Sequence, residues 1–112
     1  MTDKSPITTH ILNLESGLPA ADVKVTLFDG SGEQISQAKT DLDGRIILWP
    51  DAFEVGAGQY KLRFDIQDWY EAQQKESFYP YVELVFNLTD LDKHYHVPLL
   101  LNAYGFSTYR GS

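Results

Sequence analysis

Apolar residues recur at every second position in several parts of this chain of 112 residues. The pattern is clearest in QYKLRFDI, residues 59–66, and in YVELVFNL, residues 81–88. Successive side chains of a strand point to opposite faces, so this period buries one face of a sheet. We therefore expect half-buried antiparallel strands in both segments. Strands are also expected in VKVTLFD, ITTHILNL and HYHVPLLLNAYGFSTY, residues 23–29, 7–14 and 94–109.

Turn signals separate these segments. DGSG, residues 29–32, predicts a hairpin, and DLDG, residues 41–44, predicts a second turn. One short helix is expected in DWYEAQQKE, residues 68–76. Asp68 is the expected N-cap, with Glu71 three residues later as in a capping box. These elements together predict one all-β domain, residues 1–112, an antiparallel sandwich of roughly seven or eight strands with a helix on one connection.

Composition excludes several classes of function. There is no cysteine, so neither a disulfide framework nor a thiol nucleophile is available. The net charge of −7 repels polyanions, and no nucleic-acid partner is expected. We see no secretory signal and no apolar run that could cross a bilayer. The simplest expectation is therefore a cytoplasmic protein with no membrane partner.

Three histidines are the first candidates for chemistry: His10, His94 and His96. Histidine transfers protons near neutral pH, and alternation along a strand places His94 and His96 on one face. Spacing alone favours a solvated polar face. A zinc site built from the three imidazoles is a weaker interpretation than a solvated face, because no acidic residue lies at a spacing typical of a fourth ligand. No metal is expected.

The arginines near the candidate strands have two readings each. Arg45 follows a turn glycine and Arg110 lies near the C-terminus, so either side chain could simply extend into solvent without a functional role. Either could also bind a carboxylate or a planar heterocycle, because the guanidinium is a planar fork of donors. Tyr109 is more often a packing residue than a chemical one.

Five segments together resemble one family. They are THILN, GLPA, DGR, HYHVPLLL and YGFSTYRGS, residues 9–13, 17–20, 43–45, 94–101 and 104–112. This set is similar to the 5-hydroxyisourate hydrolases, the transthyretin-related enzymes of urate breakdown. Transthyretin, the hormone-carrying relative, lacks the histidine set and the YRGS ending. Asn13 in place of the usual Asp, and Asn102-Ala103 in place of Ser-Pro, are departures expected to affect local turn geometry.

The resemblance implies a fold, a reaction and a site. The fold is a transthyretin-like, two-sheet antiparallel β-sandwich with one short helix, and the assembly is a homotetramer, a dimer of dimers. The reaction is the hydrolysis of the ring amide of 5-hydroxyisourate to 2-oxo-4-hydroxy-4-carboxy-5-ureidoimidazoline, without a cofactor. The implied catalytic residues are His10, Arg45 and His96, and the implied substrate-binding residues are Tyr109, Arg110, Gly111 and Ser112.

The roles within this set stay open at the level of sequence. One of His10 and His96 is expected to activate water while the other donates a proton or orients. His94 is given no main role. A ligand carrier of transthyretin type and a structural sandwich module are the alternatives from other classes of protein.

Overall fold

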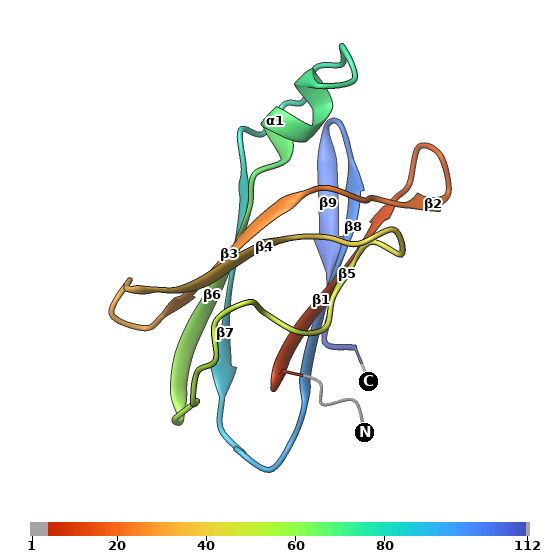
Figure 1. The fold of residues 1–112 in the computed structure, drawn as a ribbon. Coiled ribbons are helices and arrows are strands. Elements are labelled where there is room, and N and C mark those ends of the chain that lie inside the picture. The colour runs from red at the N-terminus through yellow and green to blue at the C-terminus, as the bar shows by residue number, and fades with distance from the viewer. Residues whose placement is uncertain (1–4, 112) are drawn as a thin grey trace.

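The structure, a computed structural model, describes residues 5–111 as two β-sheets packed face to face (Figure 1). The first sheet has the order β2-β1-β8-β9, with β5 paired to the same β1. Its strands are β1 (Ile7–Asn13), β2 (Leu18–Pro19), β5 (Arg45–Ile46), β8 (Tyr95–Asn102) and β9 (Gly105–Thr108). The second sheet has the order β4-β3-β6-β7. Its strands are β3 (Lys24–Asp29), β4 (Gln34–Lys39), β6 (Gly58–Phe64) and β7 (Val82–Leu88).

The period-two pattern places the predicted apolar residues on the core side of the sheet, although not all of them are fully buried. In β6, Tyr60, Leu62 and Phe64 all lie in the core between the sheets. In β7, Val82 and Leu88 are buried at the two ends, whereas the apolar residues between them are only partly covered. Since β7 is the edge strand of its sheet, fewer neighbours cover its middle. The predicted two-sheet β-sandwich is therefore confirmed.

One strand pair runs in a direction that alternation cannot reveal. β1 and β8 are parallel, in register from Ile7 opposite Tyr95 to Asn13 opposite Leu101, whereas all other pairs between the described strands are antiparallel. A parallel pair needs a long crossover, and here the whole second sheet lies between the two strands in sequence. The segment 94–109, expected as one strand, also folds into the β8–β9 hairpin.

The helix starts earlier than predicted. α1 spans Ile66–Glu71 with Asp65 at its N-cap and no side-chain capping bond, so the capping box proposed for Asp68 is wrong. Ile66 and Tyr70 are four residues apart and both are buried, so the apolar face rather than a cap determines where the helix begins. Within residues 5–111 no helix is long and apolar enough to span a membrane.

The two departures from the family pattern both make local turns. The side-chain oxygen of Asn13 accepts a hydrogen bond from the Glu15 backbone N–H, and that of Asn102 accepts one from the Tyr104 N–H. An asparagine bonded to the backbone two residues on stabilises a turn at the end of a strand. The expected effect of these residues on turn geometry is thus local.

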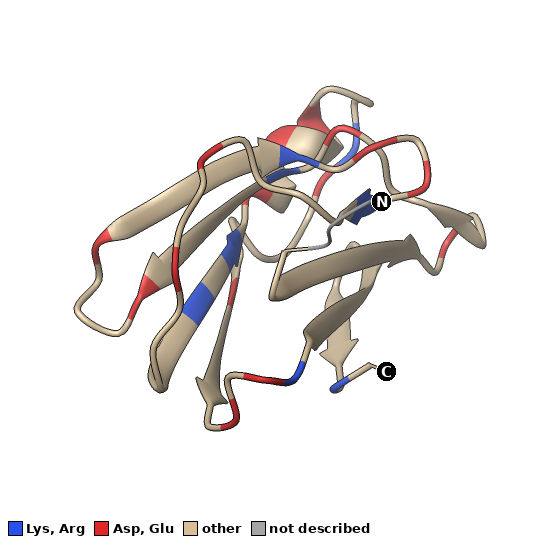
Figure 2. Ribbon diagram, turned by 60° about the horizontal axis from the view of Figure 1, so that its bottom comes forward, with Lys and Arg blue, Asp and Glu red and all other residues tan. Residues whose placement is uncertain are grey.

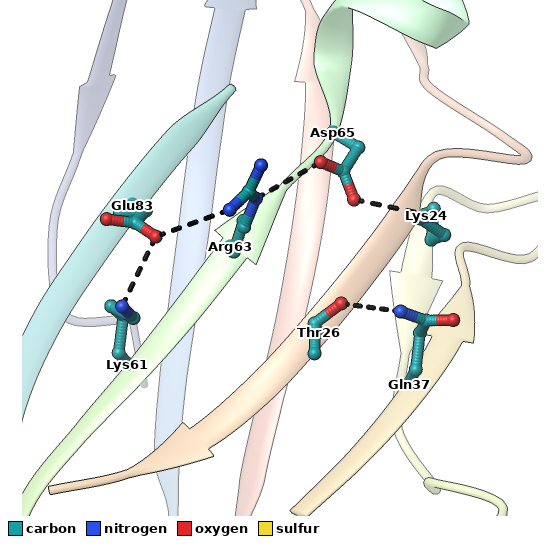
Figure 3. A network of polar contacts seen from close by, with 7 residues as sticks. All are labelled: Lys24, Thr26, Gln37, Lys61, Arg63, Asp65 and Glu83. Atoms are coloured by element: carbon teal, nitrogen blue, oxygen red, sulfur yellow. Dashed lines mark hydrogen bonds and ion pairs between the residues drawn. The ribbon is translucent and has the colours of Figure 1, made fainter. Parts of the chain in front are cut away.

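The outer face of the second sheet carries a chain of ion pairs (Figure 3). Lys61 and Arg63 both approach the Glu83 carboxylate, and Arg63 and Lys24 both approach Asp65, at 3.2 to 4.0 Å. Pairs this accessible contribute roughly 0–1 kcal/mol each. Figure 2 shows that most other acidic residues lie in the loops and turns. The cations of this chain of ion pairs are paired with carboxylates, and the three histidines lie on the other sheet or next to it.

Candidate functional site

A tight turn places Arg45 beside His10. The Asp41 carboxylate accepts a hydrogen bond from the Arg45 backbone N–H at 2.9 Å. Gly44 has a φ of +73°, and a Cβ there would lie 2.5 Å from the Ile11 carbonyl oxygen, so only glycine fits. The chain then enters β5, where Arg45 stands directly opposite His10. Paired residues project to the same face of a sheet, so the two side chains are neighbours.

The parallel pairing of β1 and β8 brings His96 to the same face. Thr8 lies opposite His96, and His10 lies opposite Pro98. The residues between them, such as Thr9 and Val97, point to the core. His10, Arg45 and His96, which come from three strands, therefore share the outward face of the first sheet.

Thr8 connects two of the histidines. Its hydroxyl lies 2.7 Å from Nε2 of His94 and 2.7 Å from Nδ1 of His96, and the threonine is 1% exposed. The two imidazole rings are stacked, with centroids 6.4 Å apart. Thr8 was not predicted as a site residue, although its position two residues before His10 on a strand places both on one face.

Burial sets the charge state of His10. It lowers the pKa of this imidazole below the usual 6.5, and the positive charge of Arg45 lowers it further. A hydrogen bond to the Asp43 backbone and the carboxylates of Asp41 and Asp43 act in the opposite direction. The net effect keeps His10 neutral at neutral pH, with a nitrogen lone pair that can accept a proton.

The C-terminal tail is held against β8. The Gly111 N–H donates to the His96 carbonyl oxygen at 2.9 Å, and a Cβ on Gly111 would lie 2.5 Å from Cδ2 of that ring. The Arg110 guanidinium donates to the His94 carbonyl oxygen and lies 4.3 Å above the Tyr95 ring. The tail is thus packed beside the histidines, with no room for a side chain at its glycine.

A pocket of about 380 Å³ lies between β7 and the end of the chain, and His96 lines it whereas His10 and Arg45 do not. His96, Tyr109 and Arg110 line it together with apolar residues of β7 such as Val85. The Tyr109 side chain is 58% exposed. Ser112, the last residue of the predicted site, lies outside the described residues.

The arrangement combines proton transfer with binding of negative charge. Two histidines supply imidazole groups that can accept or donate a proton, and the guanidinium of Arg45, which stands opposite His10, can hold a developing anion. Across residues 5–111 we find no group of three or more histidine, aspartate or glutamate side chains placed to hold a metal ion.

Fold and site together define a transthyretin-like β-sandwich that carries histidines and an arginine on one face of a sheet. The chain belongs to the HIUase/Transthyretin family, whose model matches residues 7–111. The resemblance found in the sequence is therefore confirmed.

Three known proteins show how far the similarity extends. The 5-hydroxyisourate hydrolase of Mus musculus is 41% identical over 118 residues, covering 99% of this chain and 98% of the mouse protein. The solved Klebsiella pneumoniae 5-hydroxyisourate hydrolase has a TM-score of 0.86 at 32% identity, covering 99% of this chain and 100% of that one. Sea bream transthyretin, solved in complex with thyroxine, has a TM-score of 0.83 at 27% identity, covering 96% and 95%.

Proposed function

We propose that this protein is a 5-hydroxyisourate hydrolase, a single-domain enzyme of urate breakdown that opens the ring amide of its substrate with water. The names of the mouse and Klebsiella relatives support this function. The observation that carries it is the register of the first sheet, which aligns His10 with Arg45 and sets His96 on the same face.

In the proposed reaction a histidine takes a proton from water as the water oxygen attacks the ring carbonyl carbon. We assign this step to Nε2 of His96, because its Nδ1 already bonds to the Thr8 hydroxyl, which orients the ring. The oxygen of the attacked carbonyl gains negative charge, which the Arg45 guanidinium stabilises. His10, neutral and next to Arg45, orients the substrate or water. The ring C–N bond then breaks, and the leaving nitrogen receives a proton.

The tail is proposed to complete the substrate site. Arg110 and Tyr109 line the pocket beside His96, where a cation and an aromatic ring suit an electron-rich, planar heterocycle. Gly111 brings the backbone against His96, and Ser112 follows it directly in the sequence. Arg45 opposite His10 and Arg110 in the tail are cations in a molecule of net charge −7, which supports binding of an acidic ring.

The proposed assembly is a homotetramer, a dimer of dimers, with the sites between dimers. Large apolar side chains around β2 and β5 support a covering subunit: Leu18 is 63% exposed, Leu42 89% and Leu48 66%. We propose no nucleic-acid partner, no membrane partner and no cofactor. The proposed location is the cytoplasm.

The test is to generate 5-hydroxyisourate from urate with urate oxidase and to follow its ultraviolet decay with and without this protein. We expect faster decay, and a loss of roughly 100-fold to 10,000-fold in His96→Asn. Lys75→Gln, an exposed change beyond α1, is the control and should act like the wild type. Unchanged decay with the folded wild-type protein would overturn the proposed enzymatic activity and favour a ligand carrier like the transthyretin relative.

A further inference from the structure

The Thr8 hydroxyl links the half-buried His96 to the exposed His94. A hydroxyl has one proton to donate and can accept hydrogen bonds on its oxygen. With an imidazole nitrogen 2.7 Å away on each side, it donates to one ring and accepts N–H from the other. The three groups therefore form a hydrogen-bonded chain with a direction.

The fold holds this chain in place. Thr8 is 1% exposed and sits on β1 opposite His96, so its hydroxyl position is set by the β1–β8 ladder. His94 precedes the same strand, and its backbone carbonyl accepts a bond from Arg110. A buried hydroxyl between two rings stacked 6.4 Å apart has little freedom to seek other partners.

We propose that Thr8 relays a proton between His96 and His94 during the hydrolysis, an inference that rests on the proposed function. At rest His96 carries its proton on Nδ1 and donates it to Thr8 Oγ1, while the hydroxyl donates to Nε2 of His94. When Nε2 of His96 takes a proton from water, the Nδ1 proton moves to Oγ1 and the Oγ1 proton moves to His94.

The step is balanced and reversible. His96 ends neutral with its proton on Nε2, Thr8 is again a neutral hydroxyl, and His94 is an imidazolium. His94 is exposed, so water solvates its charge, whereas His96 is half-buried, where a charge costs more. The Arg110 guanidinium beside the His94 backbone opposes that charge, so His94 holds it only transiently. When His96 gives its Nε2 proton to the leaving nitrogen, the relay runs backwards and restores the resting state.

The same geometry would suit a threonine that only positions His96. The two roles differ in what they require of His94. A relay fails when either Thr8 or His94 is removed, and removing both costs no more than removing one. A positioning threonine needs no imidazole at position 94.

The experiment uses four variants in the decay assay. Thr8→Val removes the hydroxyl but keeps the branched shape, Thr8→Ser keeps a hydroxyl, and His94→Gln removes the second imidazole. Thr9→Val is the matched control, because Thr9 is equally buried on the same strand but bonds to the Val97 carbonyl oxygen instead. The double variant of Thr8→Val and His94→Gln completes the cycle.

We expect kcat to fall roughly 10-fold to 100-fold in Thr8→Val and in His94→Gln, with no further fall in the double variant. KM should change little, Thr8→Ser should recover most of kcat, and Thr9→Val should keep it. Wild-type kcat in Thr8→Val, or in His94→Gln alone, would overturn the relay.

A second measurement separates this inference from the proposed function. Nitrogen-15 NMR of the imidazoles without substrate should show both His94 and His96 protonated on Nδ1 at neutral pH, and a changed tautomer in Thr8→Val. Unchanged tautomers in that variant would contradict the relay even if the wild type proved inactive. A wild-type protein that leaves the decay unchanged would instead overturn the proposed function.

Discussion

The charge state of His10 depends on its burial and on one neighbour 35 positions away in sequence, Arg45. Burial is the larger cause of the lowered pKa and the guanidinium is the second. Both disfavour the imidazolium, so the folded protein holds His10 neutral at a pH where an exposed histidine begins to protonate.

Arg45→Gln should therefore raise the pKa of His10 toward its usual 6.5, because one source of positive charge is lost. A proton NMR titration of the His10 ring measures this shift, with Lys75→Gln as the control. An unmoved titration would show that the two side chains do not face one another. Activity should fall in the same variant, since the guanidinium is the proposed stabiliser of the oxyanion.

The lowered pKa also has a consequence for stability. The unfolded chain binds a proton at His10 more readily than the folded one, so stability rises with pH in that region. The free energy of unfolding that neutral His10 contributes is fully present above pH 6.5, the usual pKa. It is lost as the pH falls toward the lower pKa that His10 has in the folded protein. Urea unfolding of the wild type and of His10→Asn at pH 7.5 and 5.5 measures this pH dependence. The wild type should lose more free energy of unfolding on acidification than the variant does.

At the scale of elements, the turn before β5 is the most constrained part of the site. Gly44→Ala should destabilise the protein by roughly 3 kcal/mol, because it combines a strained φ with a clash against Ile11. Gly17→Ala is the matched control: its φ of +75° is similar, but a Cβ there meets nothing within 4 Å. It should cost only about 1 kcal/mol. Equal losses in urea unfolding would contradict the close approach at Gly44.

The junction of the tail with β8 makes a different prediction. In Gly111→Ala the new Cβ would displace the His96 ring or the tail, so activity should fall roughly 10-fold to 100-fold while stability hardly changes. Gly105→Ala, where the added Cβ is 3.7 Å from its nearest neighbour, is the control. Full activity in Gly111→Ala would mean that the tail does not shape the site.

At the scale of the whole molecule, the tail and the exposed leucines predict an assembly. Sedimentation should give a particle of four times the 12.7 kDa chain mass. A C-terminal extension should reduce activity roughly 10-fold or more, because added residues would crowd the pocket beside His96, whereas an N-terminal extension of equal length should not. Similar activity in the two extended proteins would argue against a working tail.

Much of this protein can be read from its sequence, because local physics determines it. Alternation in 59–66 and 81–88 requires a sheet with one buried face, and DGSG at 29–32 closes a hairpin whatever surrounds it. The motifs around His10, His96 and YRGS were sufficient to indicate the family. The helix start was misjudged, since burial of Ile66 outweighed the capping signal at Asp68.

Only the tertiary structure decided which of these residues meet. Alternation is the same for parallel and antiparallel strands, so the pairing of β1 with β8 could not be foreseen. That pairing places Thr8 between two histidines some 86 and 88 positions away, a contact with no signal in local sequence. The sequence alone determines a β-sandwich and its chemical groups, whereas long-range register determines how those groups form a site.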